Sequence, residues 1–267
     1  MRRWARRAGR RDPTLAMSGA AEHRRVVAVT GAGGALGAAI SARLAGEEDT
    51  DVVLSDVSQA SLDATVAQLG TVAGGVETLL ADVSDVAQVE AVVARAVERF
   101  GRLDVLVSNA GVLSPNGRIH NLATEDWERA FRVNVLGAVN GIRAAVPVMR
   151  AQRSGSIVLT ASVSGLTAWS HAAPYCATKA AVIQLAKVAA VEYARDGIRV
   201  NCVCPGTFRS AIHDGLPEEA LDAIAGRHPL GLGTPADLVG IYSYLAGPAS
   251  RWTTGAALVV DGGYSAP

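Results

Sequence analysis

From Val26 onward, short β-branched runs alternate with longer stretches of helical pattern along the chain. Strands are predicted at 25–30, 51–56, 76–81, 103–108, 155–160, 198–203 and 256–260. Helices are predicted near 35–46, 58–69, 85–100, 124–150, 174–195 and 235–247. This alternation is typical of parallel strands whose two faces are covered by helices. It predicts an α/β fold, with one doubly wound, seven-stranded parallel sheet and no linker dividing it.

Two segments stand outside this pattern. Residues 1–24 are Arg-rich and are predicted to be a disordered extension: a transit peptide, a basic arm or, as we favour, sequence upstream of a true start at Met17. Residues 25–267 form the predicted folded domain. Within it, segment 207–233 is broken by prolines and glycines and holds a short helical piece near 217–226. This segment, called the lid below, either covers a site or is an ordinary surface excursion.

Charge and composition exclude several function classes. The formal net charge is zero, but eight arginines against Asp12 and Glu22 give residues 1–25 a charge of +6, which leaves −6 for 26–267. A mildly acidic body excludes nucleic-acid binding. No apolar run approaches the ~20 residues of a membrane span, so no membrane partner is expected. Cys176, Cys202 and Cys204 suit a reduced, cytoplasmic setting, and C-x-C offers too few ligands for a metal site.

A glycine-rich loop follows the first predicted strand, and a helix follows the loop. Gly31, Gly34 and Gly37 allow the backbone to approach a pyrophosphate, while the helix N-terminus presents free N–H groups. This arrangement predicts dinucleotide binding in a Rossmann fold. The second strand ends on Asp56, which is placed to accept hydrogen bonds from a ribose diol and to repel a 2′-phosphate, so NAD is preferred over NADP. Asp56 equally suits a helix N-cap leading into Ser58.

Tyr175 and Lys179 lie four residues apart in a predicted helix and therefore share one of its faces. The chain has 25 Lys and Arg residues but only two lysines, so a lysine at this offset is conspicuous. A positive charge close to a phenol favours the phenolate and lowers its pKa from about 10. The pair predicts a tyrosine that exchanges protons near neutral pH.

These motifs, taken in order, resemble the short-chain dehydrogenases/reductases, of the short single-domain dehydrogenase type. The resemblance covers Val26 to Ala266 and includes Asn109-Ala110-Gly111 after the fourth strand, Pro205-Gly206 after the sixth, and the ending Val260-Asp261-Gly262-Gly263. It implies the catalytic residues Asn134, Ser162, Tyr175 and Lys179. It implies cofactor contacts from Gly31, Gly34, Ala35, Leu36, Gly37, Asp56, Asp82, Val83, Asn109, Ala110, Gly111, Tyr175, Lys179, Pro205, Gly206, Phe208 and Ser210. Taken singly, Asn134 equally fits a bridge between backbone groups in a distorted helix, and Ser162 equally fits the cap of a turn.

The sequence departs from the family pattern at two positions. Ala35 stands where the usual loop has glycine, and Ser108 stands where asparagine is common. The loop also fits the family's extended branch, which includes epimerases and dehydratases. Members of that branch carry a longer C-terminal substrate domain, whereas Asn109-Ala110-Gly111 is typical of the shorter dehydrogenases. A methyl group at Ala35 fits if its φ stays negative.

The resemblance implies an NAD-dependent oxidoreductase that interconverts a secondary alcohol and a ketone, with Tyr175 as general acid/base. Ser162 would hold the substrate oxygen, Lys179 would lower the tyrosine pKa, and Asn134 would order a water beside Lys179. Alternatives are a 3-oxoacyl thioester reductase using NADPH and a non-catalytic dinucleotide sensor. A homotetramer, or a homodimer, is expected, with helices 124–150 and 174–195 at the interface.

A mostly apolar substrate pocket is predicted, and it suits a small to medium apolar substrate. Its expected lining is Leu113, Val163, Trp169, Phe208, Ile212 and His213. Trp169 and Phe208 fit equally well as residues that pack the lid against the core. No arginine is clearly placed to pair with a substrate anion, and Arg209 fits a solvated position better.

Overall fold

The computed structural model describes residues 23–210 and 218–266. Seven parallel strands form one sheet in the order β3-β2-β1-β4-β5-β6-β7. The strands are β1 (Arg25–Thr30), β2 (Thr50–Asp56), β3 (Val76–Leu80), β4 (Val105–Ser108), β5 (Gly155–Thr160), β6 (Ile198–Pro205) and β7 (Ala257–Val260). The predicted seven-stranded parallel sheet is confirmed.

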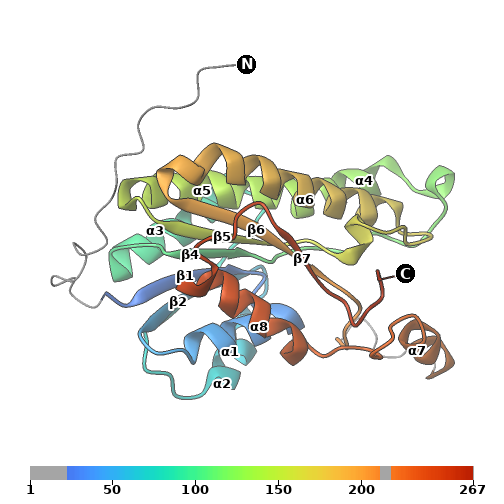
Figure 1. Cartoon of the computed structure of the whole chain (residues 1–267), viewed down its shortest axis with the longest axis horizontal. Helices are drawn as coiled ribbons and strands as arrows, with labels where there is room; N and C mark the ends of the chain where they lie inside the picture. Colours follow the sequence, from blue (N-terminus) through green and yellow to red (C-terminus); the bar gives the residue numbers. More distant parts are fainter. Residues whose placement is uncertain (1–22, 211–217, 267) are drawn as a thin grey trace, which may run out of the picture.

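Helices cover both faces of this sheet. They are α1 (Ala35–Ala45), α2 (Gln59–Leu69), α3 (Val86–Phe100), α4 (Thr124–Phe131), α5 (Gly137–Gln152), α6 (Ala173–Tyr193), α7 (Glu218–Ala225) and α8 (Pro235–Ala246). Figure 1 shows α3, α5 and α6 on one face and α1, α2 and α8 on the other. Of the helices in the described part of the chain, none has the length and apolar character needed to cross a membrane.

The core explains why the strands read as nearly continuous apolar runs. Successive side chains of β1 point to opposite faces, so Val26 and Ala28 join the core under α3, α5 and α6, while Val27 and Val29 join the core under α1 and α8. All four are at most 1% exposed. A strand buried on both faces has no polar face, which is the expected character of a parallel sheet.

The helix predicted near 124–150 is present as one continuous helical run, but it contains a π-helical turn that the sequence did not predict. The chain forms α4, then a π-helical turn at Arg132–Leu136, then α5. The side chain of Asn134, in the middle of this turn, bonds to the backbone of Val112 and to Thr178. Such tertiary bonds stabilise an extra residue in the helical ladder, and π-turns of this kind often occur at functional sites.

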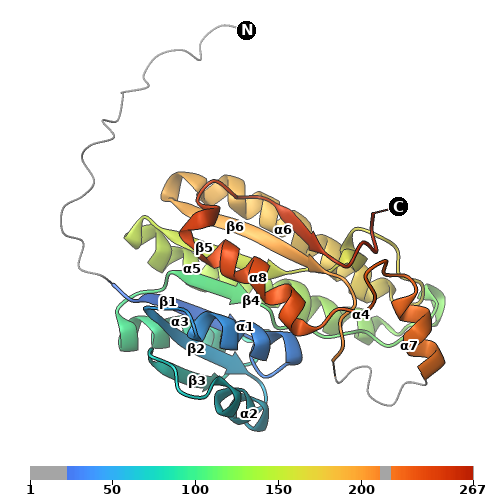
Figure 2. The same ribbon diagram turned by 60° about the horizontal axis from the view of Figure 1, so that its bottom comes forward.

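The order of the strands reverses between β1 and β4, so the connections after these two strands run in opposite directions. A crevice opens at such a point, beyond the carboxyl ends of the strands, and this is where open α/β sheets bind ligands. Figure 2 shows the strands side by side, with α7 at the same end of the molecule as their carboxyl ends. An isolated β-bridge pairs Phe208 with Gly233, so the two ends of the lid lie side by side. Residues 1–22 and 211–217 lie outside the described residues, so the predicted N-terminal extension and part of the lid stay predictions.

Candidate active site

A cavity of about 510 Å³ lies at the carboxyl ends of the strands. Its lining includes every residue that the sequence predicts for the cofactor site: Gly31, Gly34, Ala35, Leu36, Gly37, Asp56, Asp82, Val83, Asn109, Ala110, Gly111, Tyr175, Lys179, Pro205, Gly206, Phe208 and Ser210. Ser162 lines the same cavity. Seven separate segments of sequence therefore converge at the carboxyl ends of the strands.

The glycine loop is fixed by close backbone contacts. Gly31 has a φ of +64°, and a Cβ on it would lie 2.6 Å from the Cα of Ala110. A Cβ on Gly37 would lie 1.9 Å from the Gly31 carbonyl oxygen. The Asn109 amide donates to that same carbonyl at 3.1 Å. Helix α1 starts after Gly34 without a side-chain cap. Its first N–H groups are therefore available to an anion, which is the fit that a dinucleotide pyrophosphate requires.

Ala35 is the first residue of α1 and is exposed. Its helical position requires no positive φ, so the alanine is accommodated where the family pattern has glycine.

Asp56 is the last residue of β2, and its side chain holds the glycine loop by a hydrogen bond. One of its carboxylate oxygens accepts from the Gly33 N–H at 2.9 Å, and the other accepts from the Ser58 N–H at 3.1 Å. The N-cap of α2 is Ser58, whose hydroxyl accepts from the Ser61 N–H. The alternative of Asp56 as the helix cap is therefore wrong. A carboxylate has about four lone-pair sites, so Asp56 retains acceptor capacity toward the cavity.

Lys179 is buried next to Tyr175. Its Nζ donates to the Thr160 carbonyl at 2.8 Å and lies 5.7 Å from the centroid of the Tyr175 ring. Ser162 follows the end of β5, and its hydroxyl accepts from the Ser164 N–H at 3.1 Å. The Ser162 side chain also interacts with the Tyr175 phenol and lowers its pKa, although less than burial raises it. The serine, the phenol and the ammonium thus form one contiguous polar group in the cavity wall.

The expected direction of the Tyr175 pKa is wrong for this structure. Burial raises the pKa of Tyr175, and the interaction with Ser162 only partly lowers it. Burial also lowers the pKa of Lys179 to about 8. Both shifts have one physical cause, because an enclosed site disfavours the charged form of every group in it.

Asn134 lies behind the cavity wall and is not one of its lining residues. Its Oδ1 accepts from the Val112 N–H at 2.8 Å, and its Nδ2 donates to the Val112 carbonyl and to Thr178 Oγ1, each at 3.0 Å. Both amide hydrogens are therefore used. Asn134 bridges backbone groups in a distorted helix, as one of the two interpretations expects. The water-ordering role stays a prediction.

The predicted substrate residues are only partly brought together. Leu113 and Phe208 line the cavity. Trp169 does not line it, but its ring meets the Tyr175 ring edge-on at 6.2 Å. Val163 does not line it either, because it is buried in a short 3-10 turn that contacts α6. Ile212 and His213 lie outside the described residues.

Sequence reasoning missed several lining residues: Val57, Ala81, Val112, Arg129, Val133, Thr160 and Ala161. Most of them lie next to a predicted residue at a strand end, and that position is the signal that identifies them. Arg129 is different, because it reaches the cavity from α4, one turn before Val133. Arg129 thus adds a cationic side chain to the cavity lining that the sequence analysis did not consider. Arg209, the arginine considered from sequence, is exposed and is not in the lining.

Within residues 23–210 and 218–266, no group of three or more His, Cys, Asp or Glu side chains is arranged to hold a metal ion.

Comparison with known proteins agrees with this geometry. Residues 31–265 match the family model described as Enoyl-(Acyl carrier protein) reductase. The chain is 39% identical over 251 residues to cis-4-hydroxycyclohexanecarboxylate dehydrogenase of Sinomonas cyclohexanicum, covering 93% of this chain and 99% of that protein. It is 35% identical over 240 residues to the 3-oxoacyl-(acyl-carrier-protein) reductase of Thermotoga maritima, covering 90% and 97%. The crystal structure of NAD+-bound xylitol dehydrogenase superposes with a TM-score of 0.84 at 29% identity, covering 90% and 99%.

Proposed function

The chain belongs to the short-chain dehydrogenases/reductases and is an oxidoreductase that interconverts a secondary alcohol and a ketone; from this premise we propose that it uses NAD and that Tyr175 is its general acid/base. One observation carries the proposal: Tyr175, Ser162 and Lys179 form a contiguous group in the cavity that the glycine loop and Asp56 also line. A proton-transferring group and a dinucleotide cradle in one cavity are the two requirements of this chemistry.

The residues divide the proton chemistry among them. The Ser162 hydroxyl donates to the substrate oxygen and stabilises the charge that develops there. The Tyr175 oxygen takes the hydroxyl proton of the alcohol, and it returns a proton when a ketone is reduced. Lys179, with a pKa of about 8, is mostly charged at pH 7 and favours the phenolate against the effect of burial. NAD, when bound, supplies the acceptor for the hydride that leaves the alcohol carbon.

NAD is preferred because of the charges around the ribose site. Asp56 is a carboxylate at the end of β2 that repels a 2′-phosphate. Among the cavity-lining residues, the cationic side chains are Lys179, which belongs to the catalytic group, and Arg129 on α4. Preference for NAD also favours alcohol oxidation as the working direction. A relative named for cis-4-hydroxycyclohexanecarboxylate, a ring alcohol that carries a carboxylate, supports a cyclic secondary alcohol as substrate.

The second candidate is a 3-oxoacyl thioester reductase using NADPH, which the similarity to the Thermotoga maritima enzyme favours. A comparison of the two cofactors separates these candidates. We expect turnover with NAD and cyclic or acyclic secondary alcohols, followed as absorbance of NADH, and at least tenfold weaker turnover with NADP. Faster reduction of 3-oxoacyl thioesters with NADPH would select the second candidate.

Replacement of Tyr175 tests the mechanism. Tyr175→Phe should lower kcat by a factor of 1,000 or more and leave the Kd for NAD nearly unchanged, because only the proton-transferring oxygen is removed. Tyr193→Phe is a matched control at the other end of α6, outside the cavity. Retained turnover in Tyr175→Phe would contradict the mechanism. Tight binding of NAD by the wild type without turnover on a broad panel would instead support the dinucleotide sensor.

We also propose that residues 25–267 act as one catalytic domain with residues 207–233 as its lid, and that the chain assembles as a homotetramer or homodimer through helices near 124–150 and 174–195. A cytoplasmic location remains the expectation from its cysteines.

A further inference from the structure

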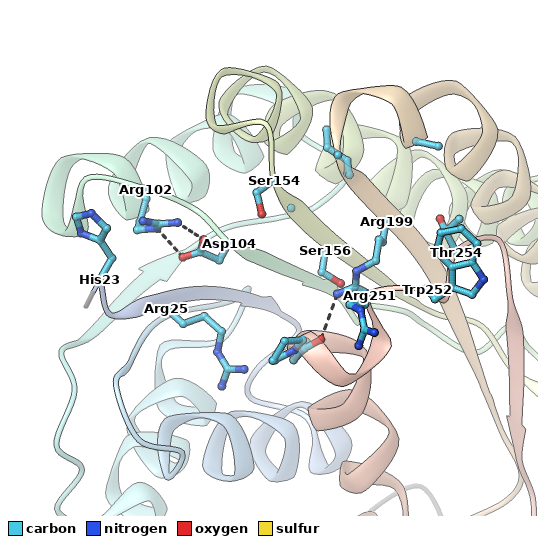
Figure 3. A pocket seen from close by; sticks show the side chains of 17 residues that line it. His23, Arg25, Arg102, Asp104, Ser154, Ser156, Arg199, Arg251, Trp252 and Thr254 are labelled. Atoms are coloured by element: carbon cyan, nitrogen blue, oxygen red, sulfur yellow. Dashed lines mark hydrogen bonds and ion pairs between the residues drawn. The ribbon is translucent and has the colours of Figure 1, made fainter. Parts of the chain in front are cut away.

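A second and larger cavity, of about 740 Å³, lies at the amino ends of the strands, opposite the end that holds the candidate active site. It is formed where β1, β5 and β6 begin, between the C-terminal end of α8 and the loop that leads into β7 (Figure 3). The residues that line it do not overlap with those of the candidate active site. Its volume is within the range of small-molecule sites in proteins.

Positive charge is concentrated in this cavity, although the body of the chain is acidic overall. Four arginines line it, together with one carboxylate, Asp104. Arg102 pairs with Asp104 through two contacts, of 2.8 and 2.6 Å, and Arg25 pairs with Glu47. Within the described part of the chain, Arg199 and Arg251 have no carboxylate partner. The cavity therefore retains two uncompensated positive charges.

Arg199 is the second residue of β6 and lies at the wall of the cavity. Its Nη2 donates to the Leu245 carbonyl at 2.9 Å and to the Gly247 carbonyl at 3.5 Å, which holds the guanidinium against the end of α8. Its Nη1 is buried and has no hydrogen-bond partner. Arginine does not deprotonate in proteins, and a buried N–H without an acceptor is costly. The guanidinium is thus held only by neutral backbone carbonyls, and its positive charge at the cavity wall has no carboxylate beside it among the described residues.

An exposed aromatic side chain also lines the cavity and favours a ligand with an apolar part. Trp252 is 97% exposed, directly follows Arg251, and lines the same cavity. Figure 3 shows Arg199, Arg251 and Trp252 on the same side of the cavity. An exposed indole beside cationic groups offers a face on which a planar group packs. The N-terminal segment of the chain is not a suitable occupant of this positively charged cavity, because residues 1–11 contain six arginines.

We propose that this cavity binds a small organic anion, with its carboxylate or phosphate against Arg199 and Arg251 and its planar apolar part against Trp252. Charge selects the anionic group, and the indole selects a ring over an extended polar chain. This site is independent of the proposed dehydrogenase activity.

Calorimetry on the whole chain, saturated with NAD to fill the cofactor site, tests the proposal with two probes, 2-naphthoate and 2-naphthyl phosphate. We expect saturable binding of at least one probe that weakens as salt concentration rises. The stronger of the two identifies carboxylate or phosphate as the preferred group. Arg251→Gln and Trp252→Ala each remove an exposed part of the site, so each variant should fold and should weaken binding about tenfold.

Arg199→Met should abolish binding, whereas Arg209→Gln, which changes an exposed arginine outside the cavity, should leave it unchanged. The proposal is overturned if neither probe binds saturably, or if binding survives Arg251→Gln and Trp252→Ala at the wild-type Kd. The second result would place the probe at another site. Because NAD is present throughout and no turnover is measured, failure here is separable from failure of the proposed enzyme activity.

Discussion

Lys179 shows at the scale of one residue how function opposes stability. The side chain is buried, and burial lowers its pKa from 10.5 to about 8. A shift of this size corresponds to about 3 kcal/mol against the charged form at pH 7. The hydrogen bond from Nζ to the Thr160 carbonyl returns about 1 kcal/mol. The charge beside Tyr175 is therefore retained at a net cost to folding.

Lys179→Met should be catalytically inactive yet more stable than the wild type, by about 2 kcal/mol in urea unfolding at pH 7. The difference depends on pH in a defined direction. Below about pH 8 both states of the wild type are protonated and the penalty is full. As pH rises from about 8 toward 10.5, only the unfolded state keeps the proton, so wild-type stability rises relative to the variant.

The only other lysine in the chain provides the control. Lys187 is exposed on the same helix, so Lys187→Met should change neither stability nor its pH dependence by more than about 0.5 kcal/mol. A Lys179→Met variant less stable than the wild type at pH 7 would contradict this account of the buried charge.

At this scale the sequence predicted which residues meet but not their electrostatics. Gly31 and Asp56 were predicted to meet because parallel strands bring their carboxyl ends together. The place of Ser162, Tyr175 and Lys179 in the same cavity was predicted from the family resemblance. The direction of the Tyr175 pKa depends on how completely the site is enclosed, which no spacing in the sequence records. Arg129 was missed for a related reason, since its reach into the cavity depends on how α4 packs.

The π-turn that joins α4 to α5 is the main feature of the secondary structure that the sequence did not predict. Hydrophobic periodicity over 124–150 continues through the π-turn at Arg132–Leu136, so the sequence gives no boundary there. The turn is specified by tertiary contacts of Asn134 instead. A Cβ on Gly111 would lie 3.2 Å from Asn134 Oδ1 and 3.3 Å from Lys179 Nζ, so one glycine separates these two side chains. Asn134 thus positions the wall against which the lysine lies.

Asn134→Ala should lower the free energy of unfolding by about 1–2 kcal/mol, because the half-buried N–H and carbonyl of Val112 lose their partner. It should also lower kcat about tenfold or more, with a smaller change in KM, because the position of Lys179 is disturbed. Urea unfolding and steady-state kinetics measure the two effects separately.

Gln152→Ala is the matched comparison for this prediction. The Gln152 amide, at the end of α5 and outside the cavity, accepts from the Leu103 N–H and donates to the Leu103 carbonyl, so its loss should affect stability without the same fall in kcat. Unchanged kcat in Asn134→Ala would show that Asn134 serves only to bridge the backbone.

The two ends of the parallel strands carry different sites. The motif residues lie at the carboxyl ends, and their order along the chain predicted a site there. The amino ends carry ion pairs such as Arg102–Asp104 and Arg24–Asp51, and the basic cavity lies among them. The arginines of that cavity come from separate loops and strand starts that share no spacing pattern. Only the fold brings them together, so the sequence did not predict them.

Assembly is the remaining prediction at this scale. Both helical stretches expected at an interface carry exposed apolar side chains: Phe131 and Leu136 in the first, and Val188 and Val191 in the second. Val191 is 81% exposed and lies three residues from Val188, so the two side chains share one face of α6. A pair of apolar side chains on an otherwise polar surface suits contact with another copy of the chain.

Val191→Glu should therefore reduce the mass measured by light scattering from that of a tetramer to that of a dimer or monomer, because a carboxylate buried at a symmetric interface meets its own copy. Val66→Glu introduces the same charge on α2, on the opposite face of the sheet, and should leave the mass unchanged. A wild-type chain that is monomeric at micromolar concentration would refute the assembly. A Val191→Glu variant with the wild-type mass would instead exclude this face of α6 from the interface, since an unpaired buried charge at its centre is not tolerated without several kcal/mol of loss.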